Sequence, residues 1–173
     1  MVERCNLEKH PILVFIERLP FFREFSEEEK SKLVQASGVF EKFKDGDSII
    51  SEGDTGAALF VVLTGTIRIV KSTVASVKEG HISLQEPEVI TLAELKAGSI
   101  FGEVSLISDR PRNTSALASS AEVVVMKITK EVVENFNLTI QKKFHTQLIQ
   151  VLVQRLDDMN TKFIKLKSGL QKG

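Results

Sequence analysis

The residues from Gly98 to Ser115 carry the side chains whose types and order could bind a ligand. Phe101-Gly102-Glu103 ends a predicted strand at a glycine, and a short apolar helix is expected over Val104–Ile107. The first turn of a helix presents backbone N–H groups without partners inside the helix, so this turn suits an anion. Arg112 follows nine residues after Glu103, directly after a proline. Its planar guanidinium matches the oxygens of a phosphate.

Glu103 adds a hydrogen-bond acceptor beside this predicted phosphate site. A carboxylate accepts hydrogen bonds from sugar hydroxyls, and phosphate and ribose together indicate a nucleotide. Two alternatives stay open at this point. Gly102 could serve only as a strand-ending turn, or Glu103 and Arg112 could pair with each other in a site that binds nothing. Burying an arginine without an anion is costly, which argues against the second alternative.

Glycine usage divides the chain into a β-rich middle and helical ends. Eight of the ten glycines lie between Gly38 and Gly102, and none occurs from residue 103 to residue 168. Closely spaced glycines between short apolar runs are typical of turns between strands, whereas a glycine inside a helix costs about 1 kcal/mol. Helices are predicted over Pro11–Leu19 and Ser26–Ser37, the second with Ser26 and Glu29 as a capping box and Gly38 as its stop.

Between these helices and the C-terminal region, short apolar runs alternate with turns. Strands are predicted around Phe40–Phe43 and over Ser48–Ser51, Leu59–Leu63, Ile67–Val70, Val89–Leu95 and Glu122–Ile128, with an extended hairpin around Glu79–Gly80. This pattern favours a mainly β fold, a sandwich or a jelly-roll β-barrel, with flanking helices. We expect an N-terminal helical segment over residues 1–38, a β-barrel over residues 39–128 and a C-terminal hinge and helix over residues 129–173.

Composition places the chain among ordinary soluble proteins. It has 173 residues with 23 basic and 23 acidic side chains, and a single cysteine, Cys5. Zero net charge argues against a general nucleic-acid binder. One cysteine excludes an internal disulfide, and neither a secretory signal nor a membrane span is apparent. The expected location is the cytoplasm.

The last segment, from about Thr129 to Leu170, is predicted to be helical and to carry a coiled-coil seam. Up to Leu152 this face is expected to pack on its own barrel, and beyond Leu156 to form a homodimer. The lysines near its end, Lys162, Lys165, Lys167 and Lys172, are expected to be solvated. Apolar residues recur there at alternating spacings of three and four: Ile149, Leu152, Leu156, Met159, Phe163, Leu166 and Leu170.

The stretch from Phe101 to Ser115 resembles the phosphate-binding cassette of the cyclic nucleotide-binding domain family, F-G-E-x-x-L-(L/I)-x4-P-R-x-x. The resemblance covers roughly Leu19 to Thr129. Further matches, in the same order as in the family, are Leu19-Pro20-Phe21-Phe22, Asp45-Gly46-Asp47, Glu52-Gly53-Asp54 and Thr64-Gly65. The resemblance therefore implies a jelly-roll barrel that binds a cyclic nucleotide.

The resemblance also implies roles for individual residues. Backbone N–H groups of Gly102, Glu103 and Val104 would face the ligand, the Glu103 carboxylate would hold the ribose 2′-hydroxyl, and Arg112 would pair with the cyclic phosphate. Leu106 would anchor the cassette to the barrel, and Val61, Leu63 and Phe101 would form walls. A residue of the C-terminal helix would cover the base, but no motif identifies it. The implied ligand-binding set is Phe101, Gly102, Glu103, Val104, Ser105, Arg112, Asn113 and Thr114.

Asn113 departs from the family pattern and leaves the base preference open. In the family, kinase subunits that prefer cyclic AMP tend to have a small apolar residue here, and domains that prefer cyclic GMP tend to have threonine. Asparagine both donates and accepts hydrogen bonds. We expect cyclic AMP as the ligand, with cyclic GMP as the alternative, and neither a metal nor a separate cofactor.

Three classes of protein could use such a binding site. A transcription factor of the catabolite-activator type would need a winged helix-turn-helix after the C-terminal helix; the printed chain ends at Gly173, so no DNA partner is expected. A metal-dependent enzyme would need clustered ligands, but His10, His81 and His145 are scattered. We therefore expect a non-enzymatic receptor that signals to an unidentified effector protein through movement near residues 130–136. The alternative is a constitutive dimeric scaffold with a vestigial cassette.

Overall fold

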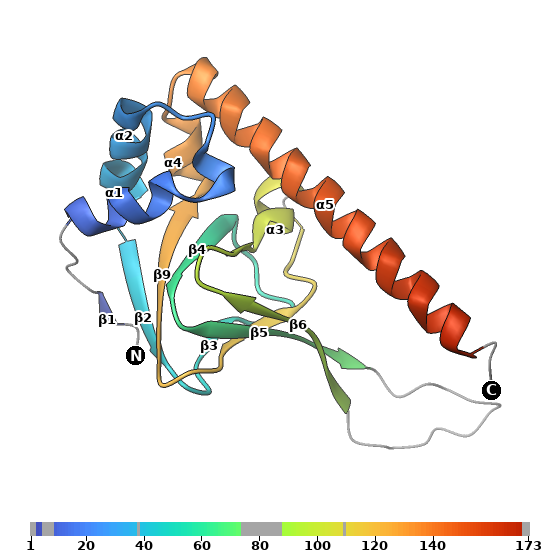
Figure 1. Cartoon of the computed structure of the whole chain (residues 1–173). Helices are drawn as coiled ribbons and strands as arrows, with labels where there is room; N and C mark the ends of the chain where they lie inside the picture. The colour runs from blue at the N-terminus through green and yellow to red at the C-terminus, as the bar shows by residue number, and fades with distance from the viewer. Residues whose placement is uncertain (1–2, 5–8, 38, 74–87, 109, 171–173) are drawn as a thin grey trace.

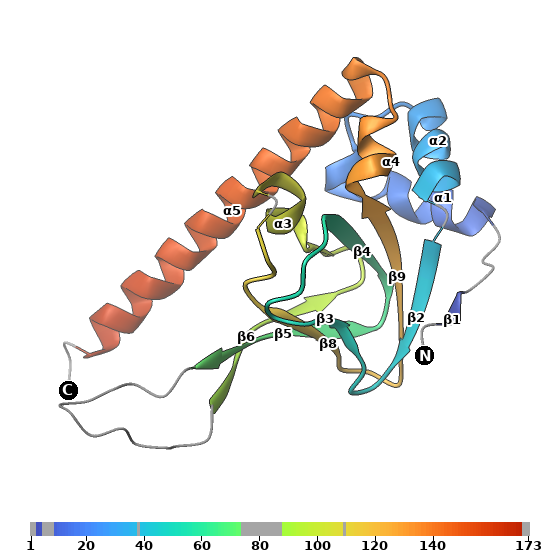
Figure 2. The same cartoon turned by 180° about the vertical axis from the view of Figure 1, so that it is seen from behind.

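The computed structural model describes residues 3–4, 9–37, 39–73, 88–108 and 110–170, and its centre is a pair of antiparallel sheets (Figures 1 and 2). The first sheet has the order β1 (Glu3–Arg4), β2 (Val39–Lys44), β9 (Glu122–Thr129), β4 (Ala58–Thr64) and β7 (Ile100–Phe101). The second has the order β3 (Ser48–Ile50), β8 (Ser115–Ala118), β5 (Thr66–Thr73) and β6 (Glu88–Lys96). The predicted jelly-roll β fold with flanking helices is confirmed.

Strand β4 contributes to two separate apolar clusters because successive side chains of a strand point to opposite faces. Phe60 and Val62 join the cluster that also contains Ile67 and Val125. Leu59, Val61 and Leu63 join the other cluster, with residues of the N- and C-terminal helices. This strand is therefore buried on both faces, as its continuous apolar run suggests.

A tight turn at Gly65 joins β4 to β5. Its φ is +83°, and a Cβ atom there would lie 2.4 Å from the carbonyl oxygen of Glu122. Only glycine fits both the backbone conformation and this close approach. The turn fixes where β5 begins, and β5 and β6 then run together as a long ribbon toward one side of the molecule (Figure 1). The predicted hairpin around Glu79–Gly80 lies outside the described residues.

The N-terminal helices pack beside the first sheet. They are α1 (Lys9–Glu17), a 3₁₀ turn (Pro20–Phe22) and α2 (Glu27–Ser37). The predicted capping box is confirmed: the Ser26 N–H donates to Glu29 Oε2 at 2.7 Å, and the Glu29 N–H donates to Ser26 Oγ at 3.2 Å. Helix α1 begins and ends two residues earlier than predicted. The expected stop at Gly38 lies outside the described residues.

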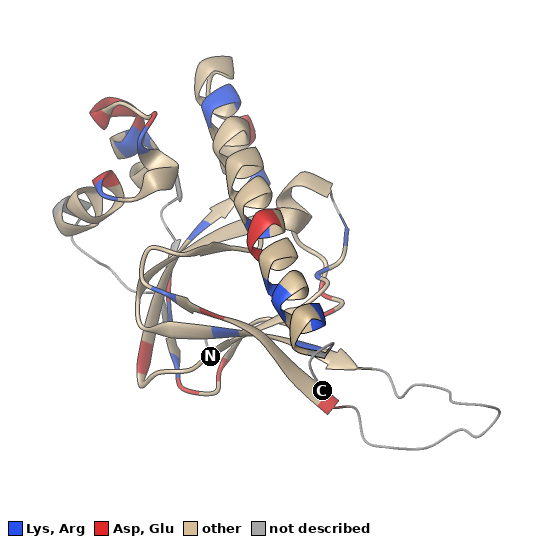
Figure 3. Cartoon of the chain, turned by 45° about the vertical axis from the view of Figure 1, so that its right-hand side comes forward, with Lys and Arg blue, Asp and Glu red and all other residues tan. Residues whose placement is uncertain are grey.

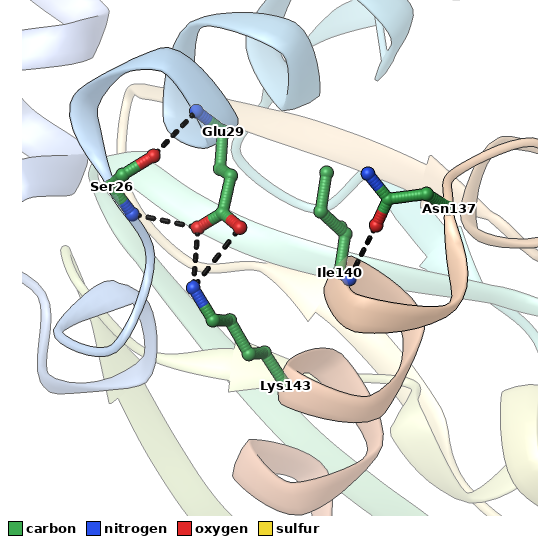
Figure 4. A network of polar contacts seen from close by, with 5 residues as sticks. All are labelled: Ser26, Glu29, Asn137, Ile140 and Lys143. Atoms are coloured by element: carbon green, nitrogen blue, oxygen red, sulfur yellow. Dashed lines mark hydrogen bonds and ion pairs between the residues drawn. The ribbon is translucent and has the colours of Figure 1, made fainter.

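The C-terminal region, predicted to be helical with a hinge near residues 130–136, consists of two helices. Helix α4 (Lys130–Glu134) ends with Asn135 as its C-cap residue, and α5 (Leu138–Leu170) begins after a short joint. Asn137 caps the new helix, because its side-chain Oδ1 accepts from the Ile140 N–H at 3.0 Å (Figure 4).

The face of α5 that packs on the domain is different from the predicted seam. Ile140, Phe144 and Leu148 are buried, and the ring of Phe144 contacts Phe21 edge to face at 5.2 Å. Ile149 is 60% exposed, so the expected packing of the seam through Leu152 is wrong at its first position. Ile149 points away from the helical core because it lies about 100° around the helix from Leu148, whereas Leu152, one turn beyond Leu148, is half-buried.

No helix among the described residues combines the length and the apolar character needed to cross a membrane.

Candidate functional site

The predicted cassette forms one wall of a cavity. Gly102, with a φ of +79°, turns the chain from β7 into α3 (Glu103–Ser108). A Cβ atom at Gly102 would lie 2.9 Å from the Ala58 carbonyl oxygen and 2.9 Å from Nη1 of Arg112. The glycine therefore allows the Arg112 side chain to lie against the backbone at the start of α3.

Arg112 is fixed by its backbone and by its side chain. Its N–H donates to the Asp54 carbonyl at 2.9 Å, and its own carbonyl accepts from the Gly53 N–H at 2.8 Å. The guanidinium donates to the carbonyl oxygens of Gly102 at 2.7 Å and Ala58 at 2.9 Å. These contacts hold the cation in one orientation beside the cavity.

The electrostatics at Arg112 reflect its burial. The residue is 8% exposed, and this burial lowers the pKa of the guanidinium, while the nearby carboxylates of Glu103 and Asp54 act in the opposite direction. Arginine stays charged throughout the physiological range despite such a shift. A positive charge is therefore held largely out of water.

Glu103, the first residue of α3, is only 2% exposed. Its carboxylate is paired with Arg155 of α5, which donates from Nη1 to Oε1. The second terminal nitrogen of Arg155 donates to the carbonyl oxygen of Ile100. The open alternative in which Glu103 pairs with Arg112 is not what the structure has: each of the two has a different partner.

The cavity has a volume of about 570 Å³ and lies between the β-ribbon, the cassette and α5. The ribbon of β5 and β6 contributes apolar side chains to the cavity, including Ile69, Leu92 and Leu95. All eight residues of the predicted ligand-binding set line it: Phe101, Gly102, Glu103, Val104, Ser105, Arg112, Asn113 and Thr114.

Asn113 and Thr114 lie at the cavity beyond Arg112. The Asn113 carbonyl oxygen accepts from Lys71 Nζ at 2.6 Å, and the same ammonium group pairs with Glu52 at 2.8 Å. Lys71 thus ties the end of the cassette to β5. The hydrogen bond from Lys71 lowers the pKa of the Glu52 carboxyl.

Two predicted wall residues are not at the cavity. Val61 and Leu63 belong to the opposite face of β4 and lie in the core cluster with the helices, for the reason given above. Phe101 does line the cavity, and its ring stacks on Phe60 at 5.1 Å. Leu106, the predicted anchor, is buried in the core cluster.

The sequence did not identify the residues that α5 places at the cavity, which are Arg155, Asp158, Met159 and Lys162. Lys162 is exposed, as predicted for the solvated helix end, and it also contributes to this lining. Asp158, Met159 and Lys162 lie three, four and seven residues after Arg155, so all four share one face of the helix. This spacing is a signal that the sequence contains. Figure 3 shows acidic and then basic residues along this part of α5.

A metal centre finds no support in the described part of the chain. No group of three or more histidine, cysteine, aspartate or glutamate side chains gathers there to hold an ion.

Comparison with known proteins agrees with this geometry. Residues 40–138 match the family described as the cyclic nucleotide-binding domain. The chain is 30% identical to cGMP-dependent protein kinase 2 of Homo sapiens over 126 residues, which are 73% of this chain and 15% of the kinase. It is thus similar to a small part of a much longer protein.

Solved structures share the fold. A cyclic nucleotide-binding domain from Methylobacillus flagellatus matches with a TM-score of 0.69 and 24% identity, over 90% of this chain and 82% of that one. The regulatory domain of Toxoplasma gondii PKA, solved with cAMP, matches with a TM-score of 0.63 and 22% identity, over 82% of this chain and 50% of that one.

Proposed function

Because this chain belongs to the cyclic nucleotide-binding domain family, we propose that it is a receptor that binds cyclic AMP in the cavity beside Arg112. It acts as a binding module without chemistry of its own. Ligand binding shifts α5, which passes the signal to a partner protein.

The observation that carries this proposal is the state of Arg112. Its guanidinium is buried at the edge of a cavity, and no ion pair joins it to a carboxylate among the described residues. Burying such a charge costs free energy unless an anion pairs with it. Two of its five N–H donors bond to backbone carbonyls, so the remaining donors can bind phosphate oxygens while the side chain stays anchored.

The rest of the cavity fits a nucleoside. Glu103 offers carboxylate oxygens to the ribose 2′-hydroxyl, and the apolar side chains of the ribbon and of Met159 offer surfaces to the base. The cavity volume falls in the range of about 300–1,000 Å³ found for small-molecule sites. Asn113 is neither the small apolar residue associated with cyclic AMP nor the threonine associated with cyclic GMP, so it does not decide the base; the similar fold of the Toxoplasma gondii PKA regulatory domain, solved with cAMP, favours cyclic AMP. The names of the similar kinases favour cyclic GMP, which is the second candidate.

The proposed output surface is the exposed seam of α5. Side chains such as Ile149, Leu156 and Phe163 are more than half exposed. Apolar side chains at this spacing are typical of paired helices. We propose that a second copy of the chain covers the seam over residues 149–170, that the dimer contacts an unidentified effector protein, and that it works in the cytoplasm.

Thermal unfolding of the ligand-stripped chain tests the binding proposal. Cyclic AMP at about 100 times its Kd stabilises the folded state by about 2.7 kcal/mol, which raises the Tm by roughly 5–10 °C. Arg112→Ala should remove this increment because the phosphate loses its cation. Arg110→Ala, an exposed arginine outside the cavity, should retain it.

The outcomes separate the alternatives. A larger increment with cyclic GMP than with cyclic AMP overturns only the base preference. No increment with either nucleotide, in protein shown to be free of bound nucleotide, contradicts the receptor and leaves the dimeric scaffold as the function.

A further inference from the structure

The C-terminal half of α5 has one side chain that hydrogen-bonds to the rest of the domain among the described residues. Before this half, Ile140, Phe144 and Leu148 bury the helix in the core. Beyond residue 149, the hydrogen bonds that reach the domain from the described residues of α5 are the two made by Arg155. Arg155 is therefore the polar link between the exposed part of α5 and the cavity.

Arg155 bonds two groups that belong to different elements, one in the cassette and one just before it. One nitrogen donates to Oε1 of Glu103 on α3, and the other donates to the backbone oxygen of Ile100 on β7. The backbone oxygen is fixed by the sheet, because Ile100 pairs with Val61 of β4. The guanidinium is rigid and planar, so a fixed contact on one side sets the position of the carboxylate on the other.

The orientation of Glu103 depends on this contact. Its side chain is almost fully buried, and Arg155 is its ion-pair partner among the described residues. Without that cation, the buried carboxylate loses its ion-pair partner and turns toward solvent. With Oε1 held by Arg155, its second oxygen, Oε2, can accept a hydrogen bond from a ligand hydroxyl.

The geometry points to Arg155 as a positioning residue that makes recognition of the ribose 2′-hydroxyl depend on the docking of α5. This inference rests on the proposed function, since it concerns how the same cavity reads its ligand. When α5 lies against the cavity, Glu103 is oriented and the hydroxyl gains a charge-assisted bond. When α5 withdraws, Arg155 leaves with it and the hydroxyl loses its acceptor. The ligand hydroxyl thereby favours the docked position of α5.

The test compares each cyclic nucleotide with its 2′-deoxy analogue, measured by isothermal titration calorimetry on the full chain. A hydrogen bond to an ionised group gives the intact chain a preference of roughly 10- to 100-fold for cyclic AMP over 2′-deoxy cyclic AMP. Arg155→Met should reduce the preference to within about threefold. The affinity for cyclic AMP falls in this variant, whereas that for the deoxy analogue changes little.

Two further variants make the readout specific. Arg155→Lys keeps the charge but cannot bond both partners as a planar fork, so an intermediate preference is expected. Lys165→Met removes a cation from the same helix at a position that does not line the cavity, and should keep the full preference. Circular dichroism of each variant checks that α5 stays helical.

Each outcome has one meaning. If Arg155→Met weakens both nucleotides by the same factor, the residue only holds the helix and the inference fails. If the preference rises, Arg155 competes with the ribose, which also overturns it. If the unaltered chain binds neither cyclic AMP nor cyclic GMP, the proposed function itself fails. If cyclic GMP is the tighter ligand, the same comparison is made with 2′-deoxy cyclic GMP.

Discussion

At the scale of single residues, Gly102 decides whether Arg112 can reach its place. Replacement by alanine puts a Cβ atom within 2.9 Å of the Arg112 guanidinium and of the Ala58 carbonyl, at a φ of +79°. The left-handed conformation alone costs a non-glycine residue about 1–2 kcal/mol. We expect Gly102→Ala to lose more than this in urea unfolding, and to weaken nucleotide binding as well.

Gly53→Ala is the matched control for this prediction. Its φ is +89°, and nothing lies within 4 Å of the Cβ position, so only the conformational cost applies. Equal losses of unfolding free energy in the two variants would show that the close approach to Arg112 contributes nothing.

At the scale of elements, Glu29 joins α2 to the first half of α5. Its carboxylate accepts from Lys143 Nζ at 2.7 and 3.0 Å while it caps its own helix through Ser26 (Figure 4). The hydrogen bond from Lys143 is the main reason that the pKa of Glu29 lies below its ordinary value of 4.5, against a smaller opposing effect of burial. The same ion pair fixes the base of α5.

This lowered pKa predicts a pH dependence of stability. A depressed pKa in the folded state stabilises the fold above the unfolded pKa, and this contribution disappears as the pH falls through the folded pKa. Glu29→Gln keeps a capping-box residue but removes the charge. Its Tm should lie below that of the unaltered chain at neutral pH, and the two should converge in acid below about pH 4.5.

Glu28→Gln provides the comparison for Glu29→Gln. Glu28 pairs with Lys32 on the open surface of the same helix, where ion pairs contribute little. Its Tm should therefore follow that of the unaltered chain at every pH. A gap between Glu29→Gln and the unaltered chain that stays constant down to acid pH would refute the assignment to charge.

At the scale of the whole molecule, the exposed seam of α5 predicts self-association. Phe163, in the middle of the seam, is 59% exposed. Burying such side chains between two helices contributes about 25 cal/mol for each Å² of apolar surface removed from water. Phe163→Glu should convert a dimer to a monomer in sedimentation velocity. Thr161→Glu, about 160° away around the helix, should leave the dimer intact. A monomeric unaltered chain at high concentration would rule out this use of the seam.

Much of the fold could be predicted from the sequence because it is encoded in local signals. Turn glycines delimit β4 and β5, and Ser26 with Glu29 marks the start of α2. Strand β8 was missed because four residues, Ser115–Ala118, carry too little apolar alternation to indicate a strand. Its position depends on pairing with β3 and β5, which are distant in sequence.

The candidate site likewise has a part that a local motif indicates and a part that depends on packing between distant segments. The eight cassette residues were found together because they are contiguous apart from one short helix and loop, and all of them line the cavity. Arg155 was missed because a lone arginine on an amphipathic helix has the pattern of a solvated surface. Its contact with Glu103 joins residues 52 positions apart, and only the packing of α5 through its first half brings them together.

The long helix that carries Arg155 is also a lever, and its pivot lies at Leu148, where the buried first half of α5 ends. At 1.5 Å per residue, Arg155 lies about 10 Å from this pivot and the end of α5 about 33 Å from it. A bend that separates Arg155 from Glu103 by about 3 Å therefore moves the far end by about 9 Å. A displacement just large enough to break one ion pair is roughly tripled at the far end of the seam, a distance greater than one turn of a partner helix.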